Sequence, residues 1–280
     1  SVAASGLSSP VVVTRVMDPK LMELNGRGYL NGHTPFSAYL AFLGLTVAAI
    51  YGNEYVIVSN ERSANEGNVM YRGLEVNHQY SKSYRFEESF RSYAADAFYE
   101  PASYFSFLRP LNDVQIGLLF ASFPQYFGSF RSCNVGSKKN IWCGKCPKCA
   151  FTYLALSPFV PQATLVRIFG SDYFRDENIL THIRALVGLT PVKPFECVGT
   201  RDEAKLALLL VINKCKDEAR EIPEGLLAIK SDLQIMDDDL VLLERTVLEE
   251  WGDTANLPPE HLTILRHYWE KQLAEYRKKV

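Results

Sequence analysis

Short apolar runs and one helical repeat alternate at the start of the chain. The β-branched run Pro10–Val16 and the near-continuous apolar run Glu54–Ser59 are both predicted to be buried strands. Between them, the spacing of apolar residues predicts a helix from Pro35 to Tyr51, which Gly52 should end. Its expected buried face consists of Phe36, Leu40, Leu43, Val47 and Ile50. Strand, helix and strand in this order form a βαβ unit, so the expected fold class is α/β with a Rossmann-like parallel sheet.

The rest of the chain is predicted to be mostly helical. Residues 86–99 and 112–127 have helical patterns, with an extended segment at 104–108 between them. Further predicted helices cover residues 151–156, 164–169, 178–187, 201–216, 232–251 and 259–279. Three parts are therefore expected: an α/β part that binds the ligand (1–130), a zinc-binding segment (131–155) and a mainly helical region (156–280).

Composition narrows the class of protein without naming a partner. A hydrophobic content of 47% supports a globular core, and a formal charge of -2 gives no basic face for nucleic acid. The longest apolar stretches, Leu40–Ile50 and Leu206–Ile212, are much shorter than the roughly 20 residues that cross a bilayer. Residues 1–10 lack the charged start and apolar run of a secretory signal, which favours the cytoplasm. In that reducing compartment, clustered cysteines bind metal or do chemistry more often than they form disulfides.

Four of the six cysteines lie in one segment with the spacing Cys133-x9-Cys143-x2-Cys146-x2-Cys149. Two consecutive CxxC turns bring thiolates to one tetrahedral centre, and the upstream cysteine supplies the fourth ligand. Because four sulfur ligands leave no open position, a structural zinc site is predicted. Four unrelated buried thiols and an iron–sulfur cluster are the alternatives. A thioredoxin-like redox pair fits less well, because no matching βαβ context surrounds the motif.

Three polar blocks accompany the predicted strands and helix: Asn31–Pro35, Ser59–Asn68 and Val76–Ser83. The first begins the helix, where Thr34 is an expected N-cap and the free N–H groups suit a phosphate or carboxylate. The second follows a strand, and the third supplies His78 and Lys82. Because ligands bind beyond the carboxyl ends of parallel strands, we expect the active site in the loop Asn60–Ser83.

Each of these side chains also has an ordinary structural explanation. His33 or His78 alone could be a hydrogen-bonded structural histidine, runs of Asn and Ser usually form turns, and Lys82 alone could be exposed. Cys197, in a loop ahead of a predicted helix, is either a reactive thiol near a helix N-terminus or a small buried residue. Cys215 lies inside an apolar helical pattern and is expected in the core.

Four sequence blocks resemble a known enzyme family. They are NGHTPFSA (31–38), SNERSANEGN (59–68), VNHQYSKS (76–83) and FECVGT (195–200). In this order they resemble the UDP-N-acetylmuramoyl-L-alanyl-L-glutamate epimerases of bacterial peptidoglycan synthesis. The succession of helix, strand, polar loop and cysteine cluster also resembles the later half of the N-type ATP pyrophosphatase superfamily, whose 7-cyano-7-deazaguanine synthase branch carries such a zinc cluster. The resemblance spans roughly Arg15 to Thr200 and implies the later part of an adenine nucleotide alpha-hydrolase-like fold.

The resemblance implies an ATP- and Mg²⁺-dependent conversion of the terminal L-glutamate of a nucleotide-linked muramoyl dipeptide to D-glutamate. An acyl adenylate would remove the carboxylate charge that opposes loss of the α-proton, and a base and an acid on opposite faces would invert the centre. AMP and pyrophosphate would be released. By this resemblance His78 and Cys197 are candidates for proton transfer, Lys82 would offset negative charge, and Glu61 could hold Mg²⁺. The candidate substrate- and nucleotide-binding residues are Asn31, His33, Ser59, Asn60, Glu61, Asn68, Asn77, Gln79 and Ser81.

One motif of the superfamily, the pyrophosphate-binding Ser-Gly-Gly-x-Asp-Ser loop, does not occur in this sequence. The segment Ser5-Gly6-Leu7-Ser8-Ser9 lacks the second glycine and the aspartate. Either ATP binding is altered in this protein, or the chain is the later portion of a longer protein; we expect the second, with the loop carried by a preceding N-terminal segment. Two other functions stay open. One is another carboxylate-adenylating enzyme similar to 7-cyano-7-deazaguanine synthase, and the other is a non-catalytic binding module stapled by zinc.

Overall fold

The computed structural model describes residues 2–6, 9–29, 36–252, 254 and 256–278 of the chain. The helices in these residues are α1 (Val2–Ser5), α2 (Pro19–Gly26), α3 (Phe36–Tyr51), α4 (Tyr84–Ala97), α5 (Asp113–Ala121), α6 (Pro147–Leu156), α7 (Gln162–Phe169), α8 (Glu177–Leu186), α9 (Arg201–Asp217), α10 (Glu224–Leu233), α11 (Asp237–Leu243) and α12 (Pro259–Arg277). The strands are β1 (Tyr55–Val58), β2 (Val69–Tyr71), β3 (Leu74–Val76) and β4 (Ser103–Ser106). The fold is thus a helix-rich α/β fold.

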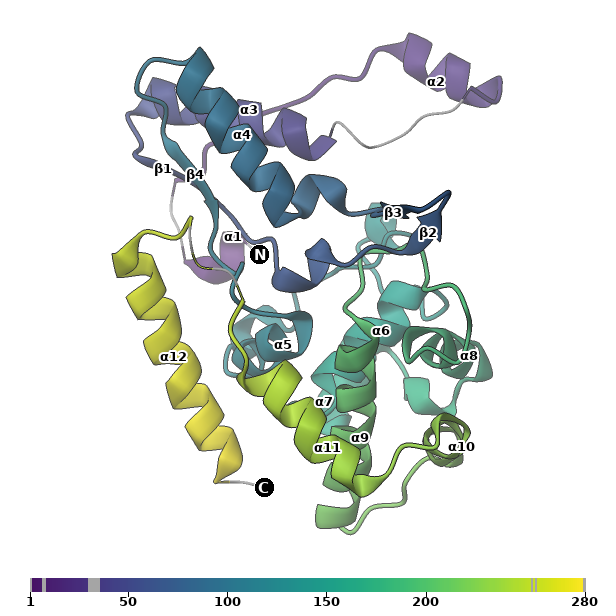
Figure 1. Ribbon diagram of the computed structural model, residues 1–280. Helices are drawn as coiled ribbons and strands as arrows, with labels where there is room; N and C mark the ends of the chain where they lie inside the picture. The colour runs from purple at the N-terminus through teal and green to yellow at the C-terminus, as the bar shows by residue number, and fades with distance from the viewer. Residues whose placement is uncertain (1, 7–8, 30–35, 253, 255, 279–280) are drawn as a thin grey trace.

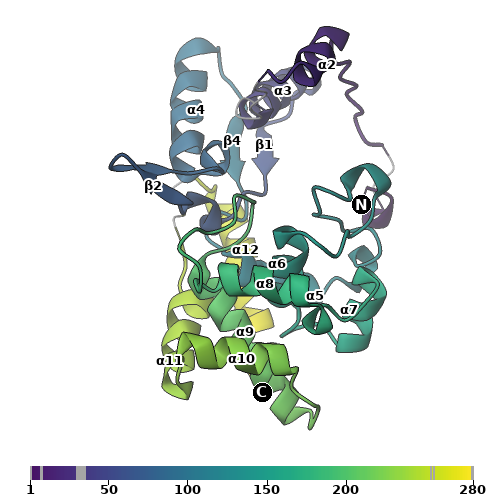
Figure 2. The same cartoon turned by 90° about the vertical axis from the view of Figure 1, so that its right-hand side faces the viewer.

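A small parallel sheet of β1 and β4 organises the upper part of the molecule in Figure 1. Tyr55 pairs with Ser103 and Val58 with Ser106. The crossover between the two strands contains α4, so the βαβ unit of this structure is β1–α4–β4. The crossover also contains the antiparallel hairpin β2–β3, which projects from the body in Figures 1 and 2.

The two faces of this sheet are covered by different helices. Alternate residues of a strand point to opposite faces. Val56 and Tyr104 pack with residues of α3 and α4 in a small apolar cluster on one face. On the other face, the rings of Tyr55 and Phe105 contact the ring of His261 near the start of α12. Helices thus lie on both faces, but they cover β1 only in part, because Ile57 is 49% exposed; the strand predicted at Glu54–Ser59 forms, but it is not buried as expected.

The main hydrophobic core lies below the sheet, among the helices that follow it. It extends from Phe105 to Trp269 and includes Cys133, Cys146 and Cys149. Helix α6 lies at its centre and contacts α5, α8 and α9. The cysteine segment and the helical region therefore share one continuous core. No helix among the described residues is both long enough and apolar enough to cross a bilayer.

The predicted strand Pro10–Val16 is wrong. These residues form neither helix nor strand, and Val12 and Val16 are 80% and 88% exposed. A β-branched run favours an extended backbone, but a strand also needs a neighbour for its hydrogen bonds. Because the described residues supply none at this position, the predicted βαβ unit that began here does not form.

The helix at 35–51 is confirmed as α3, but its predicted buried face is wrong. Leu40 and Ile50 are 46% and 72% exposed, whereas Ala41, Leu45 and Ala48 are buried. Small residues on this other face let the helix approach β1 closely, and a Cβ at Gly44 would lie 2.6 Å from Cγ1 of Val56. A helix that is apolar all round cannot be oriented from its pattern alone.

Most of the other predicted elements are confirmed within a few residues, including β1, α4, β4 and α6 to α9. The predicted helix 232–251 is wrong, because α10 ends before Gln234, whose φ of 54° is left-handed. Helix α11 and a π-helical turn (Glu244–Glu249) follow separately. The predicted helix 112–127 likewise ends at Ala121, just before Pro124 begins a 3-10 turn. The hairpin β2–β3 and helices α2 and α10 were not predicted.

Candidate functional site

The four clustered cysteines converge on one point in the structure. Their sulfur atoms all lie within 4.8 Å of one another. Cys133 Sγ is 3.8 Å from Cys146 Sγ, Cys143 Sγ is 3.7 Å from Cys149 Sγ, and Cys146 Sγ is 3.5 Å from Cys149 Sγ. A disulfide would need about 2.05 Å, so these are free thiols.

These separations fit a metal ion bound to sulfur. Four ligands at about 2.3 Å from one centre stand about 3.8 Å apart at the corners of a tetrahedron. Backbone N–H groups of Gly136 and Lys145 donate hydrogen bonds to the sulfurs of Cys133 and Cys143 at 3.1 and 3.4 Å. Such donors suit thiolates rather than thiols. The cluster can therefore hold a metal ion, at the point where the chain enters α6.

A second group of candidate side chains lies at the carboxyl ends of β1 and β4. Asn60 follows β1, and its Nδ2 donates to Ser106 Oγ at the end of β4 at 3.3 Å. Arg109 follows β4, and its Nη1 donates to the carbonyl of Glu61 at 3.0 Å. Hydrogen bonds thus connect the loop Asn60–Ser83, which we call the polar loop, to the end of the sheet where parallel sheets bind ligands.

Lys82 and Cys197 meet at this position although they lie far apart in the sequence. Lys82 Nζ donates to Cys197 Sγ at 3.2 Å. Both side chains are half-buried. A glycine is needed close to this contact, because a Cβ at Gly199 would lie 2.4 Å from Cζ of Phe151. The structure therefore brings together two of the three candidate catalytic residues.

The third candidate, His78, is held by the asparagines of the polar loop. Its backbone N–H donates to Asn68 Oδ1 at 2.8 Å, and its ring stands edge-on to Phe195 at 6.5 Å. Asn68 Nδ2 donates to the carbonyl of Pro194 at 3.3 Å, and Asn77 Nδ2 donates to that of Ala64 at 2.8 Å. Asn68 thus joins the loop to the segment that carries Cys197, whereas Asn77 holds the loop to itself.

The remaining predicted residues divide between structured and unplaced positions. Gln79 is only 3% exposed, and its Oε1 has no hydrogen-bond partner among the described residues. Ser59 is exposed and Ser81 is half-buried in a 3-10 turn (Tyr80–Lys82). Asn31 and His33 lie outside the described residues, as does the expected N-cap Thr34.

Buried Glu203 is a further candidate residue that the sequence did not indicate. Its carboxylate accepts hydrogen bonds from Ser63 Oγ at 2.7 Å, from the Asp113 N–H at 2.8 Å and from the Thr200 N–H at 3.0 Å. Thr200 and Glu203 also form the capping box that begins α9. The Thr-x-x-Glu pattern at 200–203 was the available sequence signal.

Asp113 begins α5 in the same neighbourhood and also escaped the sequence reasoning. Burial, together with the nearby carboxylates of Glu61 and Glu203, raises the pKa of Asp113 well above its usual value, although Lys193 and Lys82 oppose the shift. Burial likewise raises the pKa of Glu203. A set of acids with raised pKa values beside lysines is typical of sites that move protons.

The residues just described form what we call the polar cluster, which consists of Glu61, Lys82, Arg109, Asp113, Cys197 and Glu203. A cavity of about 280 Å³ borders it, with Ser63, Glu66 and Glu203 in its wall. A buried lysine, Lys193, pairs with Glu66 at 3.0 Å beside this cavity. Glu203 is the member of the polar cluster that lines this cavity, and Arg109 and Glu203 are two buried side chains of opposite charge in the cluster.

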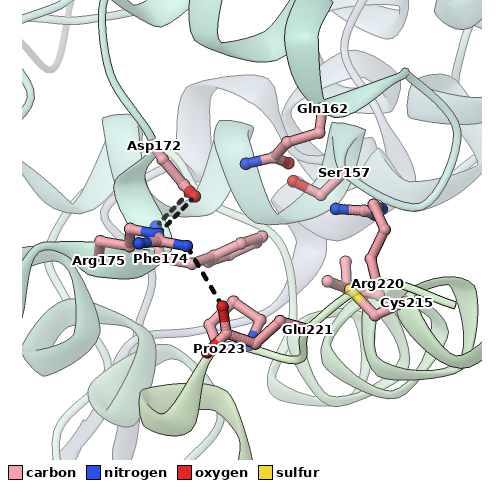
Figure 3. A pocket seen from close by; sticks show the side chains of 10 residues that line it. Ser157, Gln162, Asp172, Phe174, Arg175, Cys215, Arg220, Glu221 and Pro223 are labelled. Carbon is pink, nitrogen blue, oxygen red and sulfur yellow. Dashed lines mark hydrogen bonds and ion pairs between the residues drawn. The ribbon is translucent and has the colours of Figure 1, made fainter.

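Another cavity, of about 310 Å³, lies in the helical region and is shown in Figure 3. Arg175 lines it and pairs with Asp172 and Glu221, at 3.5 and 3.6 Å, which lie on either side of Arg175 in the figure. Cys215 lies in its wall and is 2% exposed, which confirms the prediction that this cysteine belongs to the core. None of the predicted site residues lines this cavity.

Comparisons with known proteins agree on one family. Residues 1–107 match the model of the MurL N-terminal domain, and residues 129–238 match that of the MurL C-terminal domain. The chain is 39% identical over 224 residues to a UDP-N-acetyl-alpha-D-muramoyl-L-alanyl-L-glutamate epimerase of Micromonospora sp., covering 79% of this chain and 49% of that protein. A protein of the same name from Xanthomonas oryzae is 38% identical over 210 residues, covering 73% of this chain and 47% of that protein.

The chain therefore spans about half the length of the curated relatives that it matches. No solved structure matches it.

Proposed function

This chain belongs to the MurL family, and we propose that it contributes the reaction centre of an epimerase. The enzyme would convert the terminal L-glutamate of UDP-N-acetylmuramoyl-L-alanyl-L-glutamate to D-glutamate for peptidoglycan synthesis. The observation that carries the proposal is the contact between Lys82 Nζ and Cys197 Sγ at the end of the sheet. The names of the relatives support the same reaction.

ATP and Mg²⁺ would activate the substrate before epimerisation. The α-carboxylate of the terminal glutamate would attack the α-phosphorus of ATP, which would form an acyl adenylate and release pyrophosphate. The mixed anhydride lacks the negative charge that opposes loss of the α-proton, so an enolate becomes accessible. After reprotonation on the opposite face, water cleaves the adenylate and releases AMP. Glu61 is our candidate for binding Mg²⁺, because hard cations prefer carboxylate oxygens.

Inversion requires one group that removes the α-proton and another that returns a proton to the opposite face. We assign these roles to Cys197 and His78. Lys82 donates a hydrogen bond to the Cys197 sulfur and can also offset negative charge on the enolate or the phosphate. The edge-on contact of His78 with Phe195, two positions from Cys197, supports placing both groups around one substrate carbon.

The polar loop and the helical region would share the remaining tasks. We propose that residues 1–130 bind nucleotide and substrate, with Asn60, Asn68 and Asn77 shaping the site. Residues 131–155 would hold zinc in the four-cysteine cluster, where a closed sulfur coordination sphere serves structure rather than catalysis. Residues 156–280 would support the nucleotide- and substrate-binding part and the zinc-binding segment. A pyrophosphate-binding loop would come from a segment outside this chain, and ATP use implies a cytoplasmic enzyme.

The proposal is tested with the full-length protein, ATP, Mg²⁺ and UDP-N-acetylmuramoyl-L-alanyl-L-glutamate in D₂O. We expect AMP release, D-glutamate on chiral analysis, and one deuterium at the α-carbon of the product. Cys215→Ala serves as the control, because this thiol is buried away from the polar cluster. AMP release with a deazapurine carboxylic acid instead would favour a synthase-like activity. Ligand binding without AMP release would favour a binding module.

A further inference from the structure

We propose that Arg109 is a positioning residue that fixes the main chain at Glu61 and Lys82 for the reaction proposed above. The kcat test of this inference rests on the proposed function. The positioning role itself is argued from the contacts of Arg109. The Arg109 side chain is 1% exposed, so it cannot bind the substrate directly. It must act through the residues that it holds.

The guanidinium of Arg109 joins the two polar blocks of the site. Nη1 donates to the Glu61 carbonyl at 3.0 Å, and Nη2 donates to the Lys82 carbonyl at 2.9 Å. Nη2 also lies 3.1 Å from Ser106 Oγ at the end of β4. One side chain thus sets the spacing between the residue assigned to Mg²⁺ and the lysine that contacts Cys197.

Arg109 is itself fixed by a buried ion pair. Its Nη2 lies 2.9 Å from Oε2 of Glu87 in α4, and both side chains are 1% exposed. Oε1 of Glu87 accepts a hydrogen bond from Asn256 Nδ2 at 3.0 Å. Removing two charges from water costs free energy that their attraction does not always recover. Such a pair is better explained by the geometry it imposes than by its contribution to stability.

Only an arginine can make this set of contacts. Its planar fork offers donors in several fixed directions, whereas the lysine ammonium is a compact point charge on a flexible chain. Arg109→Lys keeps the charge beside Glu87 but cannot reach both carbonyls at once. We expect Lys82 to shift relative to Cys197, and a displacement of about 1 Å can reduce the rate of a well-oriented reaction about 10²-fold.

The experiment compares Arg109→Lys, Glu87→Gln and the matched control Arg91→Lys in the full-length protein. Arg91 also bonds β4, because its Nη1 donates to the Tyr104 carbonyl at 2.6 Å and to Ser103 Oγ at 3.0 Å. These contacts lie at the opposite end of the strand. We expect Arg109→Lys to lower kcat about 10²-fold with little change in KM. Glu87→Gln should lower kcat less, and Arg91→Lys should leave it near the wild-type value.

A second readout does not depend on the proposed activity. The rate at which iodoacetamide alkylates Cys197, followed by mass spectrometry on the folded protein, reports the contact between Lys82 and the sulfur. We expect a several-fold change in this rate for Arg109→Lys and none for Arg91→Lys. If the wild type does not epimerise the dipeptide, the proposed function fails while the alkylation rates still decide the role of Arg109.

Three outcomes would overturn the inference. One is a folded Arg109→Lys variant with the kcat and the Cys197 alkylation rate of Arg91→Lys. Another applies if Arg109→Lys does not fold: Glu87→Gln then decides, and an unchanged alkylation rate in that folded variant counts against the positioning role. An equal rise in KM and fall in kcat, with unaltered alkylation, would likewise show that Arg109 only supports the fold.

Discussion

The cysteine cluster and the polar cluster solve the same problem in different ways, because each must hold several polar side chains in a fixed arrangement. The cysteine cluster uses four identical ligands and backbone N–H donors beside them. The polar cluster uses two buried charges of opposite sign. Arg109 donates hydrogen bonds to two backbone carbonyl groups, and Glu203 accepts hydrogen bonds from a hydroxyl and two backbone N–H groups.

This difference teaches where each arrangement is vulnerable. With the zinc proposed above, the cysteine cluster would depend on an ion, and removal of that ion would leave four converging sulfurs with nothing between them. The polar cluster depends on single side chains, so one substitution can leave several buried partners unpaired. The following predictions test this contrast, beginning with the largest expected effect.

Removing the metal should unfold the region around the cysteine cluster. Sulfur-bound zinc contributes on the order of 10 kcal/mol of binding free energy in small domains, and Cys149 lies fully inside the core. We expect Cys149→Ser to lose the metal and to lower the midpoint of urea unfolding strongly, as a chelator should in the wild type. Cys215→Ala, which alters a buried thiol outside the cluster, should keep both the metal and most of the stability. Elemental analysis and urea titration measure these quantities, and equal midpoints for the two variants would contradict the prediction.

Changing the sulfur of the polar cluster should impair catalysis without affecting the fold. A positioned acid or base contributes about 10²- to 10⁴-fold to a proton transfer. Cys197→Ser should therefore lower kcat by a factor in this range, because a hydroxyl is a much weaker acid than a thiol. Its unfolding midpoint and metal content should match the wild type. D-glutamate formation at saturating substrate measures the effect, and a normal rate would remove Cys197 from the mechanism.

Removing the carboxylate of Glu203 should destabilise the protein through its unpaired partners. Glu203→Ala leaves the Ser63 hydroxyl and the N–H groups of Asp113 and Thr200 without their acceptor. We expect a loss of about 3 kcal/mol in the free energy of unfolding. The neighbouring Asp202 provides the control, since its exposed carboxylate contacts Lys205 and Asp202→Ala should cost less than about 0.5 kcal/mol. Similar losses for both variants in urea unfolding would refute the role assigned to Glu203.

The polar cluster should also make the free energy of unfolding depend on pH. We attribute this dependence to Asp113 of the polar cluster rather than to the cysteine cluster. Burial and the carboxylates of Glu61 and Glu203 raise the pKa of Asp113 in the folded protein. Folded Asp113 thus keeps its proton at pH values above about 4, where the unfolded residue loses it. Its stabilising contribution is complete below that pH and declines as the pH rises through the raised pKa.

Asp113→Asn cannot lose a proton and removes this dependence. We expect the wild type to lose stability relative to Asp113→Asn as the pH is increased from about 4 toward neutrality. Asp202→Asn, at an exposed position, should follow the wild type. Urea unfolding at a series of pH values makes the comparison, and parallel curves for wild type and Asp113→Asn would show that Asp113 does not titrate as described.

The sequence was most informative where spacing alone determines structure. The cysteine cluster followed from the intervals between its members, and β1 and α9 followed from their apolar runs. The prediction of a strand at Pro10–Val16 was wrong because a strand depends on a partner strand that the local sequence does not specify. The prediction of the buried face of α3 was wrong because apolar residues surround the helix. The close approach of Gly44 to Val56 shows which face lies against β1.

The polar cluster could be predicted only in part. Lys82 and Cys197 were recognised from the residue types in their blocks, and the structure adds the contact between them. Arg109 and Glu203 have no distinctive motif of their own beyond a capping box. Their importance comes from burial and from partners on several different elements, which a linear pattern does not reveal.

The contact of Glu87 with Asn256 also bears on when the proposed reaction centre can be completed during synthesis. Glu87 accepts a hydrogen bond from Asn256, which lies 169 residues further along the chain. Ser63 donates a hydrogen bond to Glu203, which lies 140 residues further. Ribosomes add roughly 10 residues per second, so Asn256 emerges about ten seconds after the last clustered cysteine. Cys197 emerges within that interval, after the four clustered thiols are available to a metal ion. The order of residues along the chain thus places the four clustered thiols ahead of Cys197 during synthesis.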